Sequence, residues 1–140
     1  MSIRPTDEIL QEPFWKGLAE GRLLVQRCGQ CGTYRHPPNP ICFECRSFAH
    51  EFMPVSGKGH VYSFTVARHS VNASLDSQVP YIIALVDLDE GVRMVSAIHR
   101  ANATDVRIGL RVVCVIEPIS SGFALPFFVP ASEDAQLPTA

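Results

Sequence analysis

Signals that would place this chain in a membrane, in an export pathway or on nucleic acid are missing from its sequence. No run of apolar residues approaches the roughly 18 that a membrane-spanning helix needs. Residues 1–8 carry no basic stretch followed by an apolar run, so they do not resemble a secretory signal. A net charge of −2 offers no basic excess with which to neutralise phosphates. We therefore expect a cytoplasmic protein without a membrane segment, for which nucleic acid is an unfavoured partner.

The sequence also lacks the short motifs that mark common catalytic centres. It contains no GxSxG nucleophile elbow, no P-loop and no GxGxxG fingerprint, and the Gly-Lys-Gly of residues 57–59 is too short to cradle a phosphate. The histidines fall at no metal-like or triad-like spacing, and we expect each to lie on the surface or to have its hydrogen bonds satisfied. They are His36, His50, His60, His69 and His99. These absences disfavour a self-sufficient enzyme.

What the sequence does contain begins with a short segment around two cysteine pairs. We predict a helix at residues 12–20, because Pro13 suits the first turn and Gly21 suits the C-terminal end. A brief strand at residues 23–27 runs into the first cysteine pair, and the prolines of residues 37–40 force an extended connection toward the second. This stretch has little apolar core of its own.

After Pro54 the sequence takes on the pattern of an all-β domain. Short β-branched and aromatic runs are separated by glycine, proline or aspartate, and Pro126 is expected to break the last of them. The runs are 62–67, 81–86, 92–98, 110–116 and 123–129. Short strands without a long intervening helix suit a small Greek-key barrel such as the OB-fold, with an SH3-like barrel as the competing option.

The predicted fold class is therefore mainly β, with three segments. Residues 1–53 hold the N-terminal helix and the metal module, residues 54–130 form a five-stranded OB-fold-like barrel, and residues 131–140 form a mobile tail. In the barrel, Tyr62 and Phe64 alternate with polar residues and are expected to share a buried face.

The four clustered cysteines predict a structural zinc site. Cys28 and Cys31 form one CxxC pair, and Cys42 and Cys45 form a second pair after ten intervening residues. In a reducing compartment such a cluster is better interpreted as a metal site than as disulfides. Two tight turns can aim four sulfurs at one point, as a tetrahedral Zn²⁺ site requires, and no open position remains for water or substrate. Spacing alone does not separate zinc from iron in a rubredoxin-type site.

The fifth cysteine belongs to a different environment. Cys114 lies between two valines in a strand pattern, so we predict a buried side chain with no role in the metal site.

Several short motifs follow one another along the chain from residue 12 to residue 129. They are Phe14-Trp15-Lys16-Gly17-Leu18, the two CxxC pairs, Pro37-Pro38, Val55-Ser56-Gly57-Lys58-Gly59, Tyr62-Ser63-Phe64-Thr65 and Leu88-Asp89-Glu90-Gly91. In this order they resemble the DUF35 family. The resemblance implies an N-terminal helix, a rubredoxin-like zinc ribbon and a C-terminal OB-fold, which are the same segments that the residue patterns predict.

The resemblance also implies a function. The OB-fold of this family is linked to acyl-CoA, and its members act beside thiolase-like enzymes or MaoC-like hydratases, which carry the catalytic residues. Carried over residue by residue, the family's zinc ligands fall on Cys28, Cys31, Cys42 and Cys45. We thus expect a non-catalytic accessory subunit of a hetero-oligomeric acyl-CoA-processing complex, which binds or positions a CoA thioester. No motif singles out a residue that contacts CoA.

Two other functions stay open on the sequence. Zinc ribbons and OB-folds also bind single-stranded nucleic acid, and Tyr62, Phe64 and Tyr81 could stack on bases. The net charge argues against this function. Residues 16–58 carry a net charge of +3 and the whole chain carries −2, so the remainder, which includes the predicted barrel, carries −5 and would repel phosphates. The third function, a small acyl-CoA hydrolase or transferase, lacks a nucleophile–base pair.

Overall fold

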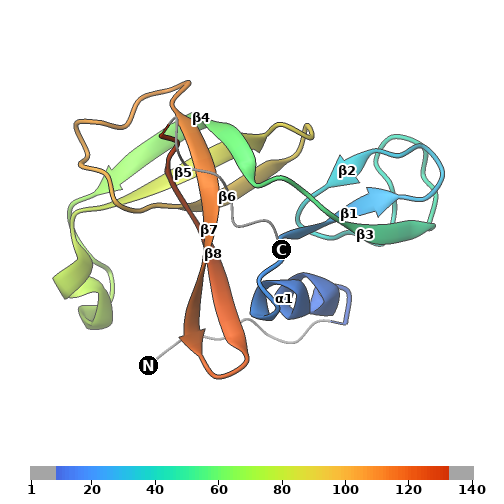
Figure 1. Ribbon diagram of the computed structural model, residues 1–140, viewed down its shortest axis with the longest axis horizontal. Helices are drawn as coiled ribbons and strands as arrows, with labels where there is room; N and C mark the ends of the chain where they lie inside the picture. The colour runs from blue at the N-terminus through green and yellow to red at the C-terminus, as the bar shows by residue number, and fades with distance from the viewer. Residues whose placement is uncertain (1–8, 133–140) are drawn as a thin grey trace.

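The fold is a zinc-ribbon-like sheet and a β-barrel, with one N-terminal helix packed against both (Figure 1). The structure is a computed structural model that describes residues 9–132. Its elements are α1 (Glu12–Ala19), β1 (Leu24–Cys28), β2 (Tyr34–Arg35), β3 (His50–Pro54), β4 (Lys58–Ala67), the 3₁₀ helix η1 (Ala73–Gln78), β5 (Tyr81–Leu88), β6 (Arg93–Ile98), β7 (Arg111–Ser120) and β8 (Phe123–Pro130). Strands β2-β1-β3 form an antiparallel sheet, and β4-β5-β6-β8-β7 close into a barrel.

This architecture confirms the predicted mainly β class with an N-terminal helix, a ribbon and a five-stranded barrel. The short elements β2, β3 and η1 were not predicted, because none of them carries a clear apolar period. The predicted absence of a secretory signal and most of the predicted mobile tail concern residues 1–8 and 133–140, which lie outside the described residues. Within residues 9–132, no helix is long and apolar enough to cross a membrane.

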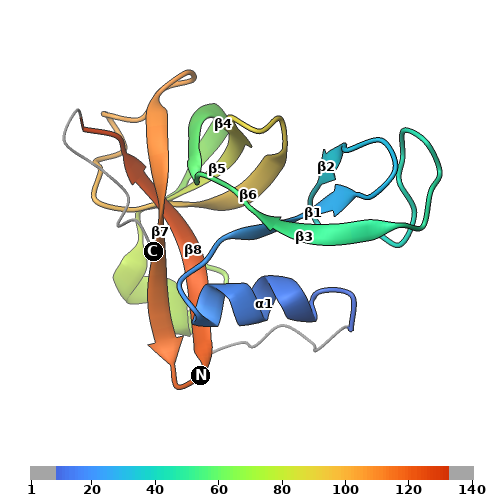
Figure 2. The ribbon, with the colours of Figure 1, turned by 45° about the vertical axis from the view of Figure 1, so that its right-hand side comes forward.

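Helix α1 packs against both β units. Figure 2 shows it below β1 and β3 of the ribbon and beside β8 of the barrel. Its buried face consists of Phe14, Gly17 and Leu18. Gly17, unfavourable for a helix in isolation, is explained by packing: a Cβ there would lie 2.8 Å from Leu24 Cδ1. On the neighbouring face the Trp15 ring lies 5.5 Å from that of Phe123 at the start of β8.

The expected buried face of β4 is wrong at one position. Tyr62 is 48% exposed, whereas its neighbour Val61 is fully buried. The register of β4 against β5 shifts between Val61 and Ser63, which is a β-bulge. Because a bulge adds one residue to a period of two, it reverses the face on which the following side chains lie. Phe64, beyond the bulge, packs against the core as expected.

The expected break at Pro126 is also wrong, since β8 runs without interruption and Pro126 pairs opposite Ile116. The carbonyl oxygen of Pro126 accepts a hydrogen bond from Ser96 Oγ on β6, so the backbone groups of this residue point away from β7. The missing N–H of proline therefore removes no hydrogen bond from the β7–β8 ladder.

A single apolar core links the helix, the ribbon and the barrel. Leu18 of α1 and Val25 of β1 belong to the same cluster as Val61, Val86 and Phe128 of the barrel, and all are nearly or completely buried. The prediction for Cys114 is confirmed, because its side chain is only 2% exposed. Burial raises the pKa of this thiol to about 12.

Candidate metal centre and an adjoining groove

The two CxxC pairs lie on two turns with the same hydrogen-bond pattern. In the first, Cys28 N–H donates to Thr33 O and Gly32 N–H donates to Cys28 O. In the second, the corresponding bonds run from Cys42 N–H to Ser47 O and from Arg46 N–H to Cys42 O. Gly32 and Arg46 occupy equivalent positions, with φ of 76° and 64°. Each turn therefore folds its pair of thiols to one side, even where the left-handed position holds a residue other than glycine.

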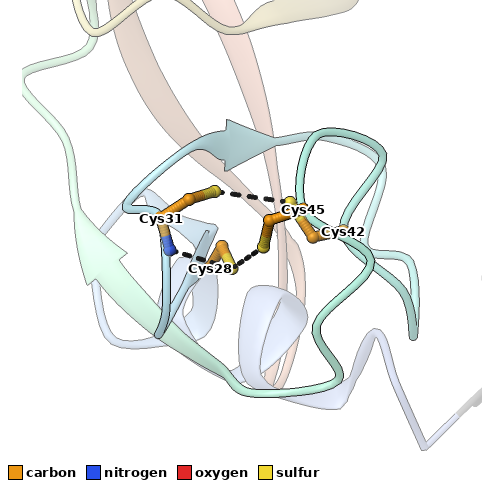
Figure 3. A group of neighbouring side chains, drawn as sticks. All are labelled: Cys28, Cys31, Cys42 and Cys45. Atoms are coloured by element: carbon orange, nitrogen blue, oxygen red, sulfur yellow. Dashed lines mark hydrogen bonds between the residues drawn. The ribbon is translucent and has the colours of Figure 1, made fainter.

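The turns bring the predicted cysteines together, as Figure 3 shows. All four Sγ atoms lie within 4.8 Å of one another. The Sγ atoms of Cys28 and Cys45 are 3.5 Å apart, and those of Cys31 and Cys42 are 3.6 Å apart. Four sulfurs placed tetrahedrally about 2.3 Å from a zinc ion would be about 3.8 Å apart. The donor set and its dimensions thus fit Zn²⁺.

Backbone and hydroxyl groups around the cluster favour the thiolate form. The N–H groups of Cys31 and Gln30 point at Cys28 Sγ from 3.5 and 3.4 Å, and they lower the pKa of Cys28 to about 6. The Thr33 hydroxyl, 3.1 Å from Cys31 Sγ, likewise lowers the pKa of Cys31. Since thiolates are the species that bind metal, these contacts prepare Cys28 and Cys31 for a cation. Burial and hydrogen bonds with the neighbouring cysteines instead raise the pKa of Cys45 to about 11.

A group of buried polar side chains holds the loop between the two cysteine turns. Arg35 donates from Nε and Nη2 to Asn39 O at 3.0 and 2.9 Å, and Asn39 N–H donates to Gln26 Oε1 at 2.8 Å. Arg35 is only 4% exposed and Gln26 is fully buried. These bonds fix the backbone of residues 36–39 against the ribbon sheet.

His36 in this loop contradicts the expectation that every histidine would lie at the surface or be fully hydrogen-bonded. Its ring lies 4.9 Å from the ring of Phe14 on α1, and its Nδ1 is buried without a hydrogen-bond partner among the described residues. Burial lowers the pKa of His36, so the imidazole is neutral at pH 7. Spacing did not indicate this position, because the contact joins segments far apart in the sequence.

His36 lines a groove of about 310 Å³ between the helix, the ribbon and the barrel, which we call the interdomain groove. Phe14 and Trp15 of α1 form one wall, and residues 36–38 of the ribbon form a second. Residues 94–97 of β6 and 125–127 of β8 complete it. Sequence reasoning missed the groove, since each segment alone looks like ordinary core or loop.

Two of the three aromatic residues considered for base stacking, Tyr62 and Phe64, have part of their ring surface covered. The ring of Tyr62 is covered by the guanidinium of Arg93, whose Cζ lies 3.5 Å from the ring centroid. Arg93 is itself held by two hydrogen bonds to Asp87. Phe64 is partly buried against the core, so only part of its ring is accessible. This arrangement disfavours the nucleic-acid alternative.

Comparisons with known proteins agree with this architecture. Residues 15–51 match the family model of the ChsH2 rubredoxin-like zinc ribbon domain, and residues 53–117 match that of the ChsH2 C-terminal OB-fold domain. The second match favours the OB-fold over the SH3-like barrel. The first, together with the four-cysteine cluster, supports structural zinc over the rubredoxin-type iron that spacing left open.

Relatives of known description cover most of the chain. It is 36% identical over 132 residues to the "Probable enoyl-CoA hydratase alpha subunit" of Thermomonospora curvata. The matched region is 93% of this chain but only 41% of that relative's length. It is 36% identical over 107 residues to the "DUF35 domain-containing scaffold protein" of Methanocaldococcus jannaschii, covering 75% of each. A chain of the solved Ltp2-ChsH2(DUF35) aldolase superposes with a TM-score of 0.84 at 35% identity, covering 92% of this chain and 100% of that one.

Proposed function

The chain belongs to the DUF35 family, and we propose that it is a non-catalytic, zinc-binding accessory subunit of an acyl-CoA-processing complex. A thiolase-like enzyme or a MaoC-like hydratase is the proposed partner and carries the catalytic residues. The observation that carries this proposal is the likeness along nearly the whole chain to a chain of a solved aldolase, together with the likeness to a hydratase alpha subunit.

We propose Cys28, Cys31, Cys42 and Cys45 as the ligands of one structural Zn²⁺, on the strength of their spacing and of the sulfur distances. A site with four protein thiolates has no position open for a substrate, so the ion supplies folding energy and no catalysis. The remaining thiol, Cys114, is buried and has a raised pKa, which makes it a poor nucleophile. Both features favour an accessory role over catalysis by this chain.

The surface proposed for docking the enzyme partner lies on the second cysteine turn. Ile41, Phe43 and Phe48 are 42%, 67% and 70% exposed there, within eight residues of sequence. Large apolar side chains that are exposed together do not stabilise an isolated chain, and such groups are typical of protein–protein interfaces. We call these residues the knuckle patch.

Co-expression with a thiolase-like or MaoC-like protein encoded beside this chain tests the proposal. The expected result is co-elution of the two proteins as one complex, with an activity on a CoA thioester that rises when this chain is added. Separate elution and unchanged enzyme activity would contradict the proposed function.

A double substitution of the knuckle patch, Phe43→Ser with Phe48→Ser, is expected to weaken complex formation by about tenfold or more, because aromatic anchors dominate interface energies. Zinc content and the melting temperature should stay close to wild type, since both side chains are exposed in the free chain. Surface plasmon resonance against the immobilised partner measures the effect. Ile108→Ser is the matched control, since Ile108 is 70% exposed but adjoins Gly109, whose N–H donates to Val61 O of the barrel. An equal loss in both variants would show that the patch is not the docking site.

A further inference from the structure

We infer that the interdomain groove binds the acyl group of a CoA thioester, with the nucleotide part of CoA outside it. This inference rests on the proposed function, which supplies the class of ligand. The place, the part of the ligand and the contacting residues come from the groove itself.

The groove lies where two barrel strands separate. The parallel pairing of β6 with β8 is confined to Ile98 and Phe128. Before that pair, four consecutive residues of β6 (94–97) and three of β8 (125–127) line the groove. Because alternate side chains of a strand point to opposite faces, consecutive residues share one cavity only along a strand edge. The groove is thus a gap between two strand edges, bridged by the hydrogen bond from Ser96 Oγ to Pro126 O.

The lining selects an apolar group. Phe14, Trp15 and Phe127 supply aromatic surface, and prolines and aliphatic residues make up most of the remaining walls. No charged residue of the described chain lines the groove, so the phosphates of CoA would find no counter-charge there. A volume of about 310 Å³ is at the lower end of the roughly 300–1,000 Å³ of ligand pockets, which suits one arm of a ligand.

Four side chains of the lining carry hydrogen-bonding groups, and three of them already use these groups within the protein. Ser96 Oγ donates to Pro126 O at 2.7 Å, and Gln11 Oε1 accepts from Trp15 Nε1 at 3.4 Å. The fourth is His36. A polar atom of a ligand would therefore meet the imidazole without displacing either of these bonds.

His36 supplies the polar contact. Its Nδ1 is buried and therefore out of reach of a ligand. Its Nε2 is not buried and makes no hydrogen bond within the described residues, so Nε2 is the nitrogen that can meet a ligand. A neutral imidazole can donate one hydrogen bond, and the carbonyl oxygen of a thioester is an acceptor of the matching kind. The bonds of Arg35 and Gln26 to Asn39 hold the His36 loop in place against the ribbon. The ribbon therefore forms a wall of the site.

Fluorescence of Trp15 reports on the groove directly, because it is the one tryptophan in the chain and it lines the groove. The chain is titrated with octanoyl-CoA and, in parallel, with CoA that carries no acyl group. The expected result is a saturable change in emission with octanoyl-CoA and a response at least about tenfold weaker with free CoA. Equal responses to both would overturn the inference, because they would place recognition on the CoA part.

Val95→Asp places a carboxylate in the groove at a position that is 65% exposed, so the fold should tolerate it. Octanoyl-CoA affinity is expected to fall at least about tenfold, whereas the matched variant Ile108→Asp, on a similarly exposed residue outside the groove, should bind like wild type. Circular dichroism checks that both variants are folded.

The two proposals fail in different ways. If the wild-type chain binds its enzyme partner but octanoyl-CoA leaves Trp15 emission unchanged, the groove inference fails and the accessory role stands. If octanoyl-CoA binds and no partner complex forms, the accessory role fails instead. If Val95→Asp loses the partner complex but keeps octanoyl-CoA affinity, the groove is a docking surface, and the inference is overturned.

Discussion

Replacing Cys42 with serine is expected to abolish stoichiometric zinc binding and to unfold the ribbon, while the barrel remains folded. Cys42 is fully buried, whereas the other residues of the second turn, 41–47, are partly or fully exposed. Zinc binding contributes roughly 10–16 kcal/mol of apparent folding free energy in small zinc-finger peptides, and a serine hydroxyl is a poor replacement for a thiolate. The ribbon is otherwise held by the β1–β2 and β1–β3 ladders and by the bonds of Arg35 and Gln26 to Asn39, and none of these interactions involves residues 42–48 of the second turn.

Elemental analysis and amide hydrogen exchange measure this outcome. Wild type should carry about one zinc per chain, whereas Cys42→Ser should carry none and should lose exchange protection in β1–β3 but not in β5 or β7. The matched control is Cys114→Ala, which removes the cysteine outside the cluster and should retain its zinc. Full zinc content in Cys42→Ser would refute the ligand assignment, and iron in the wild-type protein would refute the choice of metal.

The same variant connects the zinc to the interdomain groove. Residues 36–38 form one wall of the groove, and they lie between the two cysteine turns. Loss of the metal should therefore also remove the response of Trp15 to octanoyl-CoA. By this route a structural ion would affect ligand binding without contacting the ligand. A chelator such as EDTA, added to wild type under denaturing stress, should reproduce the effect.

The metal cluster was predictable because its information is local. Two turns of six residues, each with its own hydrogen bonds, suffice to bring four thiols together, and the CxxC spacing indicates both turns. The five barrel strands were predictable for a similar reason, since each carries its own apolar pattern. The pattern failed at Tyr62, where a one-residue bulge changes the face without leaving a mark in the composition.

The groove was not predictable because no single segment encodes it. Trp15, His36 and Val95 come from the helix, the ribbon and the barrel, and the residues next to each in the sequence form no motif that indicates a binding site. What brings them together is the shared core in which Leu18 and Val25 pack with the barrel residues. A partly buried histidine whose Nδ1 is buried without a partner becomes visible only once these contacts are known.

Gly59→Ala is expected to lower the free energy of unfolding of the barrel by about 3 kcal/mol or more. The motif of residues 55–59 gives no reason for this cost, which comes from the packing of β4 against β5. A Cβ at Gly59 would lie 2.3 Å from Asp87 O and 3.0 Å from Asp87 C, both backbone atoms of the paired strand β5. Neither atom can rotate away as a side chain would. Relief would need β4 to move off β5, against the ladder in which Gly59 pairs with Leu88.

Urea denaturation of this variant is compared with that of Gly91→Ala. Gly91 has a φ of +87°, and a Cβ there would meet nothing within 4 Å, so alanine costs only backbone strain, about 1–2 kcal/mol. If the loss at Gly59 does not exceed that at Gly91, the close approach of β4 and β5 is not what requires glycine. If the loss of stability at Gly59 does exceed that at Gly91, strand packing in the barrel is what requires glycine at position 59. The Gly-Lys-Gly sequence of residues 57–59 then needs no explanation by phosphate binding.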